Sequence, residues 1–165
     1  MKETLTKIIQ EEQDTQHGKF LTFALSEEIY GIEIRFVTEI VGVQKISALP
    51  GAPSYIKGVI NLRGKIIPVA DMRLRFRKEV APYTTRTCII VIDLQNCTAG
   101  LIVDEVREVA MIPDECITPP PSVSVGYRNR FIKGIGKAGD VVQLLLDCEQ
   151  IFKEDEMEIL NKIKA

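Results

Sequence analysis

Apolar residues recur at every second position through most of the chain from Lys19 onward. The apolar runs are short, as in "FLTFAL" and "IYGIEI", and they are rich in β-branched and aromatic residues. Turn residues interrupt them every few positions, which is typical of strands in a small all-β barrel or sandwich. Helical spacing occurs only near the ends, in about 2–13 and in 154–165. The pattern therefore predicts a mainly β protein with a short helix at each end.

The strand pattern occurs twice. Residues 31–41, "GIEIRFVTEIV", resemble residues 100–110, "GLIVDEVREVA", at an offset of 69. Farther along, "YIKGVINLRGKIIPVADM" resembles "FIKGIGKAGDVVQLLLDC", and Gly58 matches Gly134 at an offset of 76. The difference of seven residues fits a Pro/Ser-rich loop, "ECITPPPSVSVGYRNR". Each copy contains five short strands, so the chain is a tandem duplication.

The duplication predicts how the chain is divided. A five-stranded unit of this size needs closure or a partner to bury its apolar face, and two such units can share a core. The polar stretch "RKEVAPYTTR" marks the boundary between the copies. We expect an N-terminal arm at 1–18, a first five-stranded unit at 19–80, a second at 81–153 and a C-terminal helix at 154–165.

Two aspartates occupy matching positions in the copies. Asp71 and Asp147 each end an apolar strand and precede a short helix-like stretch. An aspartate at that position can accept hydrogen bonds from the free N–H groups of a first helical turn. Because the two residues lie in different copies, helix capping is favoured over a catalytic pair.

Composition and charge narrow the classes of function. The 165 residues are 45% hydrophobic and 27% charged, an ordinary globular balance, and the net charge is -2. A negative chain is a poor candidate for nucleic-acid binding, which depends on a basic face. The sequence shows neither a signal peptide nor an apolar run long enough to cross a bilayer. The four cysteines form no C-x-x-C pair, which predicts reduced thiols and a cytoplasmic location.

Motifs for catalysis are missing from the sequence. The single histidine, His17, excludes most nucleophilic triads and histidine-rich metal sites. The string "GIGKAG" matches a dinucleotide fingerprint, but "DVVQLLL" follows it and predicts a strand instead of the required helix. We therefore expect no catalytic residues, no metal and no cofactor.

One basic run remains open to two interpretations. "RLRFRK", residues 73–78, places an aromatic residue among four cations. Such a run could contact a nucleic acid or an acidic protein surface. As the end of a short helix it is more easily interpreted as a solvated face that suits the helix dipole.

A longer stretch carries a family resemblance. The string "YIKGVINLRGKIIPVADMRLRF", with "YGIEIRFVTEIVG" before it, resembles the CheW family of bacterial chemotaxis coupling proteins. The resemblance extends from about Phe20 to the C-terminal helix and implies two tandem SH3-like five-stranded β-barrels. It also implies a non-enzymatic adaptor that links the cytoplasmic tips of chemoreceptors to the regulatory domain of the histidine kinase CheA. Such a protein would be cytoplasmic and recruited to membrane-associated receptor arrays. CheW-like domains also occur in CheA and CheV, and the length favours the stand-alone form.

The resemblance further implies which residues meet partners. The expected receptor-binding residues are Leu21, Ile34, Val37, Glu39, Ile40, Gly58 and Arg63. Val123, in the Pro/Ser-rich loop, is the expected kinase-binding residue. Burial in a barrel core is an equal alternative for Ile34 and Ile40. The second copy has Gly139-Asp140 where the first has Arg63-Gly64, which favours a specific role for the arginine.

Overall fold

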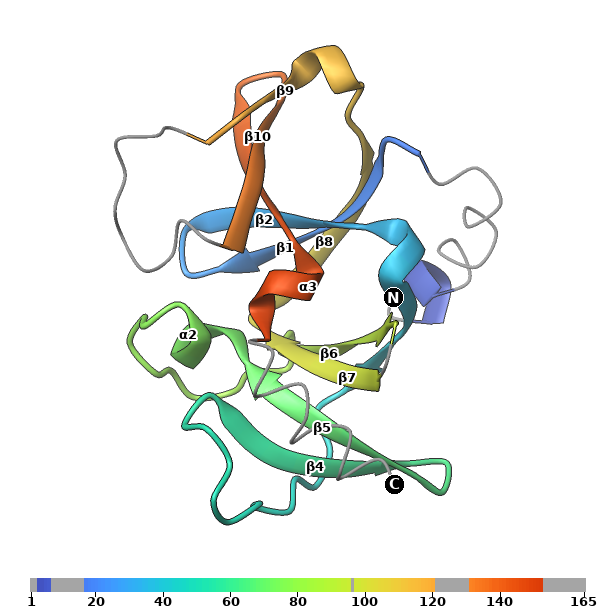
Figure 1. Ribbon diagram of the computed structural model, residues 1–165, viewed down its shortest axis with the longest axis vertical. Helices are drawn as coiled ribbons and strands as arrows, with labels where there is room; N and C mark the ends of the chain where they lie inside the picture. Colours follow the sequence, from blue (N-terminus) through green and yellow to red (C-terminus); the bar gives the residue numbers. More distant parts are fainter. Residues whose placement is uncertain (1–2, 7–16, 96, 121–130, 153–165) are drawn as a thin grey trace.

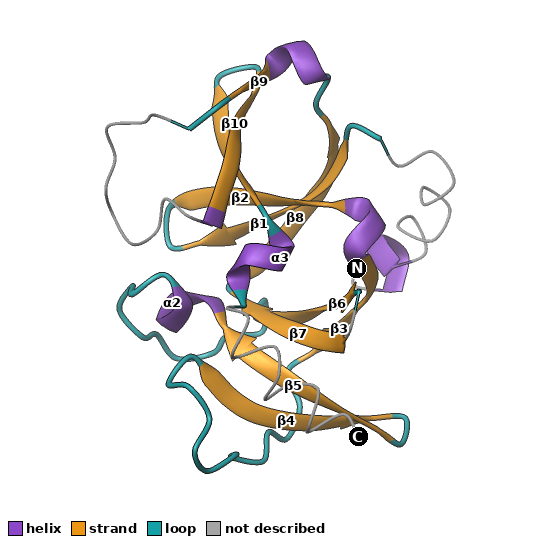
Figure 2. Ribbon diagram, in the orientation of Figure 1, coloured by secondary structure: helices purple, strands orange, loops and turns teal. Residues whose placement is uncertain are grey.

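The computed structural model describes residues 3–6, 17–95, 97–120 and 131–152, and its strands form two sheets (Figures 1 and 2). Sheet A has the order β8-β1-β2-β11-β10-β9, and sheet B has the order β3-β6-β7-β5-β4. The strands of sheet A are β1 (Lys19–Leu25), β2 (Glu28–Glu33), β8 (Glu105–Met111), β9 (Ile117–Thr118), β10 (Ile132–Ala138) and β11 (Val141–Leu146). Those of sheet B are β3 (Val37–Gly42), β4 (Ile56–Leu62), β5 (Lys65–Asp71), β6 (Cys88–Leu94) and β7 (Cys97–Val103).

Each sheet curls toward closure in the same way. The chain after β8 passes through a 3-10 helix, Asp114–Cys116, into β9, and β9 pairs with β10. The chain after β3 likewise continues to Ser47, which forms a bridge with Val59 in β4. Both sheets are therefore barrels, called barrel A and barrel B here, and the predicted mainly β fold with two such units is confirmed.

The repeats exchange their first hairpins. Barrel A combines β1 and β2 of the first repeat with β8 to β11 of the second, and barrel B combines β6 and β7 with β3 to β5. The predicted division into a unit at 19–80 and a unit at 81–153 is therefore wrong for strand pairing. The 3-10 turn Ile34–Phe36 follows β2 directly, and β3 beyond it pairs with β6 in the other sheet.

Strand register confirms the duplication. In sheet B, β5 and β7 are parallel and Val69 lies opposite Gly100. In sheet A, β11 and β2 are parallel and Leu145 lies opposite Gly31. These pairs are related by the same two offsets, 76 and 69, that the sequence repeat shows. The molecule therefore has a pseudo-two-fold axis between its barrels.

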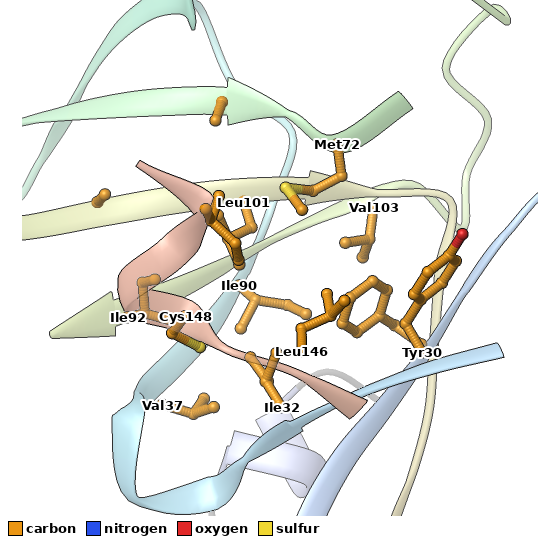
Figure 3. Close-up of a cluster of buried hydrophobic side chains, with 14 of the residues drawn as sticks. Tyr30, Ile32, Val37, Met72, Ile90, Ile92, Leu101, Val103, Leu146 and Cys148 are labelled. Atoms are coloured by element: carbon orange, nitrogen blue, oxygen red, sulfur yellow. The ribbon is translucent and has the colours of Figure 1, made fainter. Parts of the chain in front are cut away.

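The largest core lies between the barrels. Buried side chains from both sheets and both short helices converge there, as Figure 3 shows for β2, β6, β7 and β11. The labelled members are Tyr30, Ile32, Val37, Met72, Ile90, Ile92, Leu101, Val103, Leu146 and Cys148. A core shared in this way holds the two barrels together, because neither can leave without exposing it to water.

The interiors of the two barrels differ in chemistry. Barrel B encloses an aliphatic cluster that includes Ile60 and Ile67, which face each other across β4 and β5. At the matching positions of barrel A, Gly136 faces Gln143. Gln143 is only 3% exposed, and its Oε1 has no hydrogen-bond partner. Barrel A is therefore the less apolar of the two.

The short helices begin as expected. Asp71 accepts hydrogen bonds from the N–H groups of Arg73 (2.9 Å) and Leu74 (3.4 Å) at the start of α2 (Met72–Arg75). Asp147 accepts one from Glu149 N–H, at 3.1 Å, at the start of α3 (Cys148–Ile151). The capping interpretation of both aspartates is confirmed.

The described residues include only part of the two predicted terminal helices. Of the stretch at 2–13, residues 3–6 form one helical turn. The predicted helix at 154–165 lies outside the described residues. Within the part of the chain that the structure describes, no helix has the length and apolarity to span a membrane.

Candidate partner-binding site

Arg63 lies at the tip of the β4–β5 hairpin. Its φ is 52° and that of Gly64 is 85°, so both central residues of the turn are left-handed. Gly64 N–H donates a hydrogen bond to Asn61 Oδ1 at 2.8 Å, which closes the turn. This turn geometry favours glycine or asparagine, and a non-glycine residue there is strained. In the matching hairpin of barrel A the position is Gly139, with φ of 62°.

The Arg63 side chain forms an ion pair across the end of barrel B. Its Nη2 donates to Oε2 of Glu39, which lies beside a bulge in β3. The arginine side chain is 69% exposed and the glutamate side chain only 20%. The hydrogen bond and the charge of Glu39 raise the pKa of the Arg63 guanidinium above its ordinary value. The pair is neutral as a whole, and its more exposed part is the guanidinium of Arg63.

A cavity of about 490 Å³ lies beside this ion pair. The polar residues of its lining are Thr38, Glu39, Arg63, Lys65, Asp93 and Thr98. The Lys65 Nζ donates to Thr98 Oγ1 at 3.1 Å, and that hydroxyl donates to Asp93 Oδ1 at 3.2 Å. Two cations and two carboxylates thus line the cavity, which suits recognition of polar and charged groups.

Four of the expected receptor-binding residues lie in the core. Leu21, Ile34 and Val37 are completely buried and Ile40 almost so, all in the cluster between the barrels. Their side chains do not line the surface. For Ile34 and Ile40, the alternative expectation of burial in a core is therefore the one that agrees with the structure. Of the expected set, the structure brings together only Glu39 and Arg63 as side chains at one surface.

Gly58 has a role in the backbone. It lies at a bulge in β4 with φ of 150°, and a Cβ there would lie 2.7 Å from the carbonyl carbon of Ser47. Only glycine allows the Ser47 strand to approach β4 so closely. Val123, the expected kinase-binding residue, lies outside the described residues.

Sequence reasoning missed the two other charged residues of the cavity, Lys65 and Asp93. The repeat could have identified them, because their counterparts Val141 and Ala24 are apolar. The same comparison had singled out Arg63. Charge differences between matched strands are therefore a usable signal for a site in one copy of a duplicated fold.

The basic run at 73–78 contacts other parts of the protein. Arg73 pairs with Asp104 through two hydrogen bonds, of 2.8 and 2.6 Å. Lys78 pairs with Glu28, and Arg75 is buried between the barrels. The interpretation of the run as a solvated face is therefore wrong for these three residues, which form no open basic surface for a nucleic acid, whereas Arg77 is exposed.

No group of three or more histidine, cysteine, aspartate or glutamate side chains among the described residues could hold a metal ion. The site consists of a charged cavity and an exposed ion pair at one end of barrel B. Its geometry suits the binding of another macromolecule.

Comparison with known proteins finds relatives over most of the chain. The family model described as "CheW-like domain" matches residues 19–156. The chain is 33% identical over 150 residues to the chemotaxis protein CheW of Klebsiella aerogenes, covering 91% of this chain and 90% of that protein. It is 32% identical over 149 residues to CheW of Treponema pallidum, covering 88% of each.

A solved structure shows the same fold. The scaffolding protein TtCheW from Thermoanaerobacter tengcongensis superposes with a TM-score of 0.77 at 37% identity. The match covers 84% of this chain and 94% of that one. The sequence repeat, the paired barrels and these matches lead to one conclusion: the chain belongs to the CheW-like domain family.

Proposed function

We propose that this protein is a non-enzymatic adaptor that couples the cytoplasmic tips of chemoreceptors to the histidine kinase CheA. Family membership and the likeness to a CheW scaffolding protein support a scaffold role in chemotaxis. In this role the protein binds two partners at once and is recruited to membrane-associated receptor arrays. The charged end of barrel B is one of its docking surfaces.

The observation that carries the proposal is the conformation of Arg63. Its left-handed backbone is strained for arginine, whereas the matching hairpin uses Gly139. The turn itself does not require the side chain. An exposed ion pair such as Arg63–Glu39 adds little to stability. Retaining a strained, exposed arginine therefore makes sense where a partner contacts it.

The surroundings of Arg63 suit such a contact. Ile66, two residues beyond the turn in β5, is 42% exposed. Ile66 lies on the face of β5 opposite Lys65 and Ile67, so the same hairpin presents an exposed apolar side chain on one face and charged ones at the cavity, two components of a protein interface. Opposite charges on the partner would fix its register, and like charges would exclude other partners.

The test is a coupling assay with purified CheA and a receptor cytoplasmic fragment. We expect Arg63→Ala and Glu39→Ala to weaken assembly and kinase coupling by roughly tenfold, or about 1.4 kcal/mol. The melting temperature should stay within about 2 °C of wild type, because exposed ion pairs contribute little to stability.

Arg86→Ala is the matched control, since Arg86 is exposed and in a loose ion pair with Glu105 (3.7 Å) away from the cavity. It should couple like wild type. The proposal fails if the wild-type protein does not couple CheA to the receptor fragment. The assignment of the surface fails if Arg63→Ala and Arg86→Ala behave alike.

A further inference from the structure

Arg75 is the last residue of α2 and lies between the two barrels with only 2% exposure. Its guanidinium carbon lies 4.2 Å from the centre of the Tyr55 ring and 4.5 Å from that of Phe131. Its Nε donates a hydrogen bond of 2.6 Å to the carbonyl oxygen of Ile151. A buried cation therefore makes three directed contacts with three separate segments.

The contacts of Arg75 are related by the repeat. Tyr55 and Phe131 are 76 residues apart and occupy matching positions. Each precedes the first strand of its hairpin, and its carbonyl accepts the N–H of a capping aspartate, Asp71 or Asp147, at 2.8 Å. Tyr55 belongs to barrel B and Phe131 to barrel A. The guanidinium thus joins the same structural point of both barrels.

Ile151 is the repeat counterpart of Arg75 itself. The two residues meet, since one donates to the backbone of the other. A second arginine at 151 would bring two like charges together in a buried place, which is strongly unfavourable. The pseudo-two-fold axis therefore has room for one guanidinium, and the duplicated chain places it at 75.

We propose that Arg75 is a positioning residue that sets the orientation of barrel A relative to barrel B. A planar guanidinium can stack on two rings and donate in its own plane, whereas lysine cannot make this set of contacts. Apolar packing alone is non-directional and allows packed elements to slide. An adaptor has partners on separate surfaces, and the orientation of its barrels decides whether both partners can bind in one assembly. This consequence rests on the function proposed above.

The test measures the distance between the barrels by pulsed dipolar electron paramagnetic resonance. Spin labels are placed at Lys57→Cys in β4 and Lys137→Cys in β10, both exposed, in a Cys116→Ser background. The three other cysteines are buried and remain unlabelled in the folded protein. We expect Arg75→Met to shift or broaden the distance distribution by about 2 Å, the scale on which packed elements move against each other. Arg75→Lys should not restore it.

Two further variants separate positioning from stability. Ile60→Val removes a methylene group from the interior of barrel B, away from Arg75, and should lower the melting temperature without changing the distances. Phe131→Leu keeps an apolar side chain but removes one ring, and it should change the distances even if Arg75→Met fails to fold. Unchanged distributions in Phe131→Leu and in every folded Arg75 variant would overturn the proposal. This measurement uses the protein alone. A failure to bind receptor or kinase would therefore refute the proposed function but would not affect the proposal about Arg75.

Discussion

Replacing Gly58 with alanine tests how barrel B is closed. The new Cβ would lie 2.7 Å from the carbonyl carbon of Ser47 and closer still to its oxygen. Both are backbone atoms, so no side-chain rotation can relieve the contact. The strand through Ser47 must move away from β4, or β4 itself must bend.

The structure gives the size of the effect. Ser47 and Val59 exchange two backbone hydrogen bonds of 2.9 Å that hold this closure. Losing both costs about 1–3 kcal/mol, at about 0.5–1.5 kcal/mol each. Forcing alanine into a φ of 150° adds about 1–3 kcal/mol of backbone strain. We expect about 3 kcal/mol or more in total, which lowers the Tm of a chain this size by about 6–12 °C.

Urea unfolding followed by circular dichroism measures this loss, and Gly51→Ala is the matched control. Gly51 also has a positive φ, 82°, but a Cβ there meets nothing within 4 Å. Its substitution should cost only the left-handed penalty of about 1–2 kcal/mol. Equal losses in the two variants would refute the closure argument. A Gly58→Ala protein that is fully folded yet cannot bind the receptor fragment would instead support the contact expected from the family resemblance.

Two further predictions concern buried and paired polar groups. Gln143→Met should raise the free energy of unfolding by about 1 kcal/mol, because it removes a buried amide oxygen that has no hydrogen-bond partner. The reverse change at the matching position of barrel B, Ile67→Gln, should lower the free energy of unfolding by about 1–3 kcal/mol. A loss of stability in Gln143→Met would contradict this reasoning. Burial raises the pKa of Asp104, but the hydrogen bond and charge of Arg73 and the Ser26 N–H outweigh it and lower that pKa below its usual value. The stabilisation by Asp104 is therefore present above about pH 4 and is lost as the pH falls through the pKa of the folded state. In urea titrations, the difference in stability between wild type and Asp104→Asn should shrink between pH 7 and pH 3. A constant difference would contradict this prediction.

The features set by local chemistry could be predicted from the sequence. The offsets of 69 and 76 predicted the duplication. The positions of Asp71 and Asp147 predicted the caps, because a cap depends on residues that are neighbours in sequence. The exchange of hairpins could not be predicted in this way. Strands β2 and β7 have matching patterns, as do β5 and β11, so the pattern alone does not say which copy each strand pairs with.

The residues of the candidate site could likewise be predicted only in part. Arg63 stood out because its counterpart is a glycine, and the structure places it at the surface with Glu39. Val37 and Leu21 were expected at a partner surface, yet period-two alternation cannot tell a barrel interior from the core between two barrels. The cations at 73, 75 and 78 were misinterpreted because their partners lie tens of residues away in sequence.

The exchange of hairpins has a consequence for synthesis of the chain on the ribosome. The β1–β2 hairpin finds its parallel neighbour only when β11 has emerged, and the register begins at Gln143. About a hundred residues separate the two, or about 5–20 s at usual rates of translation. During that interval the apolar faces of β1 and β2 have no barrel to enter. The edge of β2 that pairs with β11 therefore stays unpaired until most of the chain has been made, which would not be so for two barrels each built from one repeat.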